Sequence, residues 1–147
     1  MLLGIALAAA AVQPTRAREQ SVEAAVQVVR DYYAAVQRHD YRAAHAIWSG
    51  NRSLSALRRG YAQTAWVRAT PFPPFTTEGG AGSIYADVNV RVDAALRNGK
   101  RQHYVGSYTL RRVNDVDGSS AAQRRWHITG AQLKEVPAGA DDRRATD

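Results

Sequence analysis

The chain has 147 residues, of which 45% are hydrophobic, and this length and composition are typical of one globular domain. It has no cysteine, which excludes disulfides, thiolate metal sites and a cysteine nucleophile. The net charge is +7, but the arginines are dispersed and no nucleic-acid-binding motif is present, so we do not expect nucleic acid as a partner.

The first residues predict a secretion signal. The apolar run from Leu2 to Val12 is too short to span a bilayer but has the length of a signal-peptide core, and small residues follow it. The basic residues that usually precede such a run are missing, so residues 1–17 are interpreted as a signal peptide or its truncated remnant. We therefore expect a periplasmic or secreted protein with no membrane span in the mature chain.

The next segment predicts an amphipathic helix. Ser21 is a candidate N-cap for a helix over Val22 to Asp40, whose apolar side chains fall on one stripe. Tyr33 lies near the centre of that stripe and is expected in the core. Tyr32 lies at its edge and is the better candidate for a pocket wall.

Two shorter helices, over Tyr41 to Trp48 and from Ser53 to near Thr64, are predicted before the residue types change. From Ala65 onward, β-branched and aromatic residues, prolines and glycines dominate. Helices followed by strands predict an α+β fold with an antiparallel sheet. We expect a single domain over residues 21–136 and a disordered polar tail over residues 137–147.

The stretch PFPPFTTEGGAGSIY, residues 71–85, holds three closely spaced glycines. A phosphate-binding loop needs its glycines between a strand and a helix, whereas here a strand follows and no Lys-Ser or Lys-Thr pair closes the motif. We interpret the glycines as a turn into the main hairpin, and the prolines as residues that end or edge a strand.

The strongest strand pattern runs from Ile84 to Leu96, and Asn98-Gly99 then predicts a hairpin. A two-residue turn would place Val92 opposite Val105. A three-residue loop with a left-handed glycine would place Val92 opposite Tyr104. Hydrophobic matching favours the three-residue loop, because a one-residue slip moves every side chain to the other face.

The favoured register also places Asp93 opposite His103 on the polar face. A last strand is predicted in RRWHITGAQLKEV, where Trp126 and Ile128 face one way and His127 the other. Its glycine predicts a bulge or bend.

The string VVRDYYAAVQRHDYRAAHAIW and the three late strands resemble the nuclear transport factor 2-like superfamily, a cone-shaped α+β fold also called cystatin-like. The resemblance covers roughly Ser21 to Val136. The strings GYAQTAWV, EGGAGSIY and LRRVNDVDG are similar to those of small exported bacterial members. The resemblance implies helices on a strongly curved antiparallel sheet, a cavity between them and often a homodimer through the outer sheet face, but it implies no reaction.

Enzymes of this superfamily suggest candidate catalytic residues. Ketosteroid isomerases use a helix tyrosine with two aspartates, and Tyr32 matches that tyrosine by its spacing to Asp40. The catalytic base does not carry over, because the stretch after Trp48 contains no acid. Cyclases and dehydratases of the fold use Asp and His pairs, for which the candidates here are His45, His103 and His127 with Asp87 or Asp93. The favoured register pairs Asp93 with His103. Since both are predicted on the polar face, a surface ion pair is the simpler interpretation.

Seven aromatic residues lie on segments that this fold would turn toward a common interior. They are Tyr32, Trp48, Tyr61, Trp66, Tyr104, Tyr108 and Trp126. They form either a core or the walls of a cavity for a small apolar or aromatic ligand. His45 and His127 are expected to be exposed, and the dispersed histidines predict no metal site and no cofactor.

The sequence therefore leaves three hypotheses. The first is an exported, non-catalytic domain that binds a small ligand or a protein partner. The second is a cyclase-, dehydratase- or isomerase-like enzyme. The third is electrostatic binding to acidic polymers or membrane surfaces through the arginines, which predicts weakening by salt.

Overall fold

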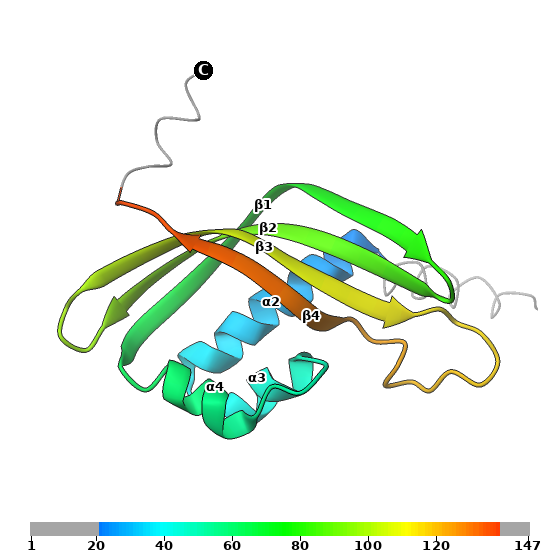
Figure 1. Cartoon of the computed structure of the whole chain (residues 1–147), viewed down its shortest axis with the longest axis horizontal. Helices are drawn as coiled ribbons and strands as arrows, with labels where there is room; N and C mark the ends of the chain where they lie inside the picture. The colour runs from blue at the N-terminus through cyan, green and yellow to red at the C-terminus, as the bar shows by residue number, and fades with distance from the viewer. Residues whose placement is uncertain (1–20, 139–147) are drawn as a thin grey trace, which may run out of the picture.

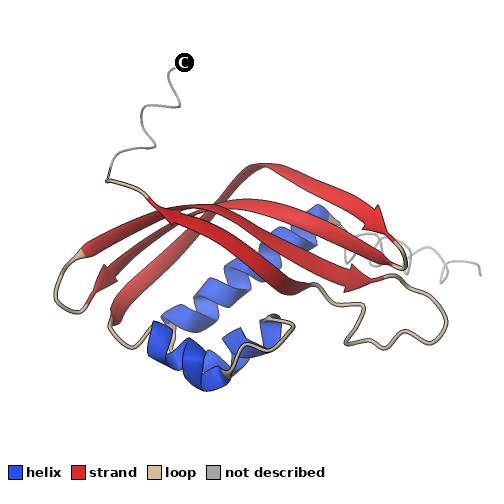
Figure 2. Cartoon of the chain, in the orientation of Figure 1, coloured by secondary structure: helices blue, strands red, loops and turns tan. Residues whose placement is uncertain are grey.

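The structure is a computed structural model that describes residues 21–138, so the predicted leader and most of the predicted polar tail lie outside the described residues. Three helices cover one face of a curved, four-stranded antiparallel sheet (Figures 1 and 2). The helices are α2 (Val22–Gln37), α3 (Tyr41–Ile47) and α4 (Leu54–Gly60). The strands are β1 (Thr64–Gly80), β2 (Ser83–Leu96), β3 (Arg101–Val113) and β4 (His127–Glu135), in the spatial order β1-β2-β3-β4. The α+β prediction is confirmed.

Each helix begins at a side chain that accepts a hydrogen bond from a free backbone N–H of the first turn. The caps and the amides that they bind are Ser21 with Ala24, Asp40 with Ala43, and Ser53 with Ala56. All three helices are shorter than predicted, the middle one by a single residue. The first ends before His39, whose φ of 61° is left-handed and does not continue a helix. The last ends at Gly60, and a turn leads into β1.

The hairpin between β2 and β3 has the predicted register. Val92 pairs with Tyr104, and Asp93 pairs with His103. The backbone N–H of Leu96 donates to the carbonyl oxygen of Lys100 across a three-residue loop, in which Gly99 has a φ of 88°. The three-residue loop is therefore confirmed. We call the helix-covered face of the sheet the inner face and the opposite face the outer face.

The glycine stretch is a turn between strands. The chain passes from Gly80 to Ser83 through a tight turn in which Gly82 has a φ of 75°, so no helix N-terminus follows the glycines. The prolines do not end the strand, because β1 continues past them after a register shift between Pro71 and Phe75. The strand tolerates them because β1 lies at the sheet edge, where a missing N–H is not needed for pairing.

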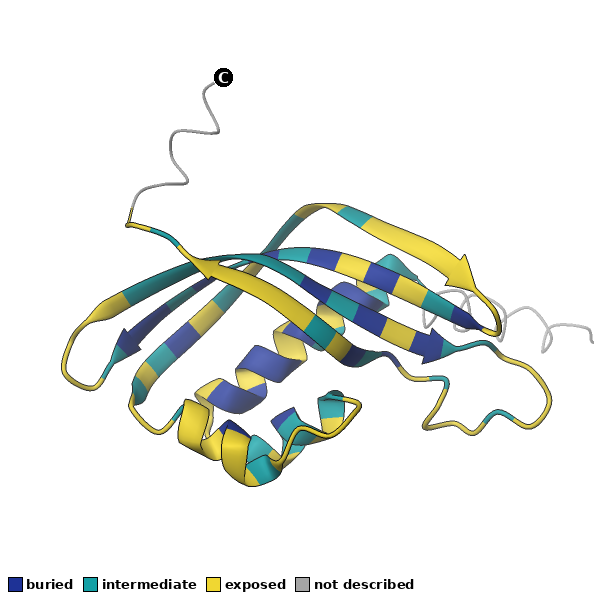
Figure 3. Ribbon diagram, in the orientation of Figure 1, coloured by how far each residue is buried: buried dark blue, intermediate teal, exposed yellow. Residues whose placement is uncertain are grey.

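The core lies between α2 and the inner face. Buried and exposed residues alternate along β2 (Figure 3), so that Val88, Val90 and Val92 pack beneath the helix. At one end of the inner face Arg112 is only 1% exposed, and a single ion pair joins its Nη2 to Asp115 at 2.9 Å. Its Nε and Nη1 are buried without a hydrogen-bond partner.

At Gly106, β3 leaves no room for a side chain beside β4. A Cβ on Gly106 would lie 1.8 Å from the carbonyl oxygen of Gln132 and 2.9 Å from the Cα of Leu133. Gly106→Ala must therefore push β4 away, and we expect the free energy of unfolding to fall by about 2 kcal/mol or more. Urea denaturation measures this change.

Gly130→Ala is the matched control, because a Cβ on Gly130 would meet nothing within 4 Å. We expect it to change the free energy of unfolding by no more than about 0.5 kcal/mol. Equal denaturation midpoints for the two variants would contradict the described β3–β4 packing.

Candidate functional site

Two pairs of tyrosine hydroxyls join the helices to one another and to the sheet. The hydroxyls of Tyr32 on α2 and Tyr61 after α4 lie 3.1 Å apart. The hydroxyl of Tyr33 on α2 is hydrogen-bonded to that of Tyr108 on β3. The ring of Trp48 packs edge-on against Tyr32 and Tyr108, with centroids 6.1 and 6.2 Å away. The predicted interior aromatic cluster therefore exists, although only part of the predicted set belongs to it.

Burial keeps three phenols of the cluster, those of Tyr33, Tyr61 and Tyr108, protonated. Desolvation raises the pKa of Tyr33, Tyr61 and Tyr108 well above the ordinary value of 10.0, because a phenolate would be poorly solvated there. The charge of Arg52 lowers the pKa of Tyr61 and Tyr108, but by less than desolvation raises it. The cluster therefore offers neutral hydroxyl groups and no base.

A pocket of about 310 Å³ opens beside this cluster, between α4 and the inner face of the sheet. Its walls include Tyr61, Tyr104 and Leu133, with Tyr33 at the back. Gln102 and Arg52 supply the other polar groups that line it, apart from one threonine. Among the described residues, Arg52 is the only charged residue in the lining.

Arg52 is held in place by two contacts. Its guanidinium carbon lies 4.5 Å from the ring centroid of Trp48, and its backbone carbonyl accepts a hydrogen bond from Nε2 of His45 at 2.6 Å. His45 is half-buried by this contact, not exposed as predicted. The indole Nε1 of Trp48 is buried and has no hydrogen-bond partner. Sequence analysis missed Arg52 because it lies between two helices, where no periodicity assigns a face.

Both neighbouring tyrosines of α2 are buried. Tyr33 is 4% exposed and belongs to the core, as predicted, and it also contributes to the pocket lining. Tyr32, predicted to be a pocket wall, is 1% exposed and does not line the pocket. The edge of the apolar stripe was predicted from the sequence of α2 alone. The pocket depends on where α4 lies across the helix, which no pattern within α2 reveals.

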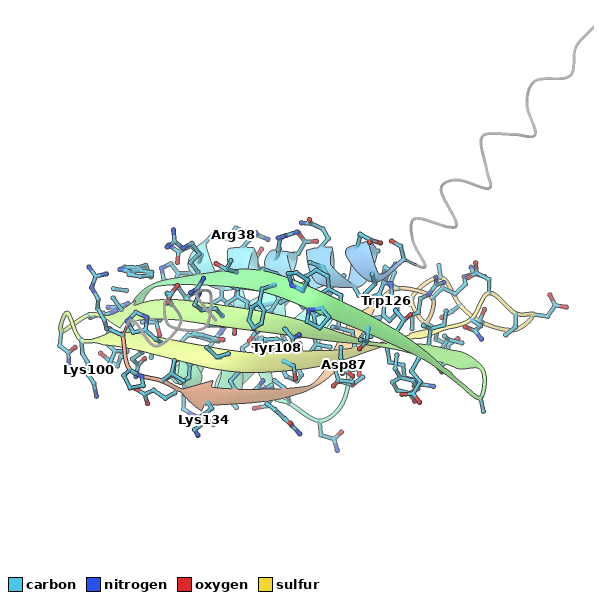
Figure 4. All side chains as sticks on the ribbon, turned by 90° about the horizontal axis from the view of Figure 1, so that it is seen from above. Arg38, Asp87, Lys100, Tyr108, Trp126 and Lys134 are labelled. Atoms are coloured by element: carbon cyan, nitrogen blue, oxygen red, sulfur yellow. The ribbon has the colours of Figure 1, made fainter. Side chains whose placement is uncertain are left out.

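The other aromatic candidates separate into three positions. Tyr61 and Tyr104 line the pocket, and Tyr108 lies behind it near the middle of the sheet (Figure 4). Trp126 is 5% exposed and lies toward the end of the molecule where α2 begins (Figure 4), and it does not line the pocket.

Trp66 is on the outer face, so its prediction as an interior residue is wrong. It pairs with Ala95, which pairs in turn with Arg101, and the guanidinium carbon of Arg101 lies 5.8 Å from the Trp66 ring centroid. The register shift between Thr64 and Trp66 produces this arrangement. The shift turns the side chain of Val67 into the core and that of Trp66 away from it.

The candidate acid–base pair lies outside the pocket. Asp93 Oδ1 and His103 Nδ1 are 2.7 Å apart, and the two side chains are 19% and 25% exposed. Both alternate with inward residues, since Val92 and Ala94 are buried. The pair is the cross-strand contact of the outer face that the register predicts, and it cannot reach a ligand in the pocket.

Residues 21–138 contain no group of three or more histidine or acidic side chains placed to hold a metal ion. Of the helices in this range, none has the length and apolar character needed to cross a membrane.

Comparison with solved structures identifies the fold. A nuclear transport factor 2-like superfamily protein from Salmonella enterica aligns over 89% of this chain and 99% of its own, with a TM-score of 0.55 and 11% identity. The chain has the nuclear transport factor 2-like fold. Neither a protein-family model nor a curated protein sequence matches it.

Two further structures with this fold carry names that suggest enzymes. A proposed dehydratase of the same family from Streptomyces avermitilis is 12% identical, with a TM-score of 0.53 over 80% of this chain and 97% of its own. A proposed aromatic-ring hydroxylase from Novosphingobium aromaticivorans is 14% identical, with a TM-score of 0.56 over 78% of this chain and 92% of its own. At these identities the likeness extends to the fold alone.

The tyrosine cluster predicts a loss of stability at high pH. Because the folded-state pKa values of Tyr33, Tyr61 and Tyr108 are raised above 10.0, only the unfolded chain ionises them near that pH. The stability due to their neutral burial is thus complete below about pH 10 and is lost as the pH rises further. Tyrosinate absorbance of the folded chain should leave these three of the seven tyrosines unionised until unfolding begins.

The variant Tyr61→Phe should remove one of the late-ionising groups and leave the earlier part of the titration unchanged. Ionisation of all seven tyrosines in one step while circular dichroism still reports a folded protein would contradict the buried cluster.

Proposed function

We propose that the protein is a non-catalytic binding domain whose pocket takes a small apolar or aromatic ligand that carries a hydrogen-bond acceptor. The observation that carries this proposal is the pocket lining. Its walls are aromatic and aliphatic, and its polar groups can each donate a hydrogen bond: the guanidinium of Arg52, which only donates, the amide of Gln102 and neutral tyrosine hydroxyls. Such a lining favours an apolar body and one oriented carbonyl or carboxylate oxygen.

The volume and the exposed apolar surface agree with this ligand class. Ligand pockets of proteins span about 300 to 1,000 Å³, so a volume near 310 Å³ suits one or two fused rings. Leu133 is 36% exposed although it lies on the inner face. A bound ring would cover this side chain and recover the free energy of removing it from water.

The lining argues against acid–base catalysis by this pocket. General acid–base catalysis needs a group whose pKa lies near the working pH, whereas burial moves the pKa of Tyr61 away from it and arginine stays protonated. Asp93 and His103 lie on the other face of the sheet. Proteins with the same fold carry enzyme names, which supports the binding of small molecules by this architecture. These names do not assign a reaction to this chain.

Filling the pocket tests the proposal. Ala56 is an exposed residue of α4 that lines the pocket, so Ala56→Trp should obstruct it without disturbing the core. With 2-acetylnaphthalene, an aromatic ketone, as the probe, we expect the variant to raise the dissociation constant at least about tenfold, as a lost snug contact typically does. Isothermal titration calorimetry on the full chain measures it.

Ala34→Trp is the matched control, since Ala34 is an exposed residue of α2 that does not line the pocket. Arg52→Gln should weaken binding of the ketone without changing the fold, because it removes the charged donor. Equal affinities of the wild type and Ala56→Trp for the ketone, or no binding of the ketone by the wild type, would contradict the proposal.

Export and self-association remain proposals that rest on the sequence. The apolar run from Leu2 to Val12 supports export, and the intact mass of the chain recovered from the periplasm of a bacterial host would be lower than that of the full sequence if a leader is removed. A homodimer through the outer face predicts a dimer peak in native mass spectrometry, and a purely monomeric spectrum would refute it.

A further inference from the structure

A groove separate from the pocket lies along α2. Its wall on α2 is formed by Ala24, Val28 and Asp31, which are spaced four and three residues apart and so lie on one side of the helix. Ala24 is nine residues from Tyr33, which is half a turn around the helix, so the groove and the pocket lie on different sides of α2. The groove has a volume of about 680 Å³. The end of α3 and the segment leading into β4 close its other sides.

The apolar part of the groove is continuous. Val28 and Ile47 are only partly buried, although both pack against the core. Trp126 is 5% exposed and completes this surface from the start of β4. The surface is large and apolar enough to hold an aromatic or short aliphatic body.

Hydrogen bonds fix the walls of the groove. The backbone N–H of Ser120 donates to Oε1 of Gln123 at 2.8 Å, and the N–H of Gln123 donates to Oγ of Ser120 at 3.1 Å. This reciprocal pair is the arrangement of a capping box, and it holds the turn that carries Arg124 and Arg125. Across the groove, the N–H of Ser49 donates to the carbonyl oxygen of Ile128 at 2.9 Å, which ties the end of α3 to β4.

The charged groups of the groove are unbalanced toward positive. Nε of Arg124 lies 3.8 Å from Asp115, but Arg125 forms no ion pair with any described residue. The one acid, Asp31, already accepts a hydrogen bond from Gln27 at 2.8 Å. Nδ1 of His127 lies 3.0 Å from the carbonyl oxygen of Arg125 and must donate to it, since a carbonyl only accepts.

We propose that this groove is a second ligand site, for a small amphipathic organic anion. The apolar body of the ligand lies on Val28, Ile47 and Trp126, and its carboxylate or sulfonate group meets the guanidinium of Arg125. A guanidinium beside an apolar surface binds such a group through charge-assisted hydrogen bonds. The proposal does not depend on the function of the pocket beside α4, because the two linings share no residue.

The probe is 8-anilinonaphthalene-1-sulfonate, with the uncharged N-phenyl-1-naphthylamine as its partner of nearly the same shape. Ala46 is an exposed groove residue of α3, so Ala46→Trp should obstruct the site and weaken the binding of both compounds. Arg125→Glu should weaken the binding of the sulfonate alone and raise its dissociation constant about tenfold, which is the effect of losing a charged hydrogen bond. Arg58→Glu is the charge-matched control, because Arg58 is exposed on α4 and lines neither site.

Fluorescence titration of the full chain gives the affinities, and amide chemical shifts locate the compounds. We expect the amide resonances of Val28, Ile47 and Arg125 to change position when the compounds bind. Shifts confined to residues of the pocket beside α4, equal weakening by Arg125→Glu and Arg58→Glu, or no binding of the sulfonate would each overturn the proposal. Ala56→Trp should leave sulfonate binding intact, so failure of the pocket proposal and failure of the groove proposal give different patterns.

Discussion

Two hydrogen bonds between tyrosine hydroxyls connect the helices to one another and to the sheet. Tyr33 to Tyr108 fixes α2 against the centre of the sheet, and Tyr32 to Tyr61 fixes the end of α4 against α2. Each hydroxyl is paired with another, and the Tyr33–Tyr108 pair is fully buried. Removing one member of that pair would leave its partner without a hydrogen bond in a site with little water. The Tyr32–Tyr61 pair ties the end of α4 to α2 beside the pocket.

The same desolvation determines the chemistry of the pocket. It holds the phenols neutral, and the one charge in the lining, Arg52, is a cation that stacks on Trp48 and does not act as a base. The titratable pair that could serve as acid and base is on the far side of the sheet. The fold thus presents donors to a ligand without a proton acceptor, which is the composition of a binding site.

Patterns that are local in the sequence predicted most of the fold. Asn98-Gly99 and the alternation of β2 were sufficient to select one of two registers, because only one register matched apolar faces. The errors concern contacts between elements. The face of Trp66 depends on a register shift, and the exclusion of Tyr32 from the pocket depends on where α4 lies, so neither follows from its own segment. Arg112 could not be predicted either, since a buried arginine on an inner strand position contradicts the apolar pattern around it.

We infer that the pocket binds its ligand without a group that titrates near neutral pH. The affinity for an uncharged aromatic ketone, measured as a function of pH, tests this inference. Because Arg52 and neutral tyrosines are the ionisable groups of the lining, we expect the dissociation constant to stay constant from about pH 5 to pH 8, the range in which histidine changes charge. A sigmoidal change within that range would place an imidazole or a carboxyl group in contact with the ligand, and would return the protein to the class of acid–base enzymes.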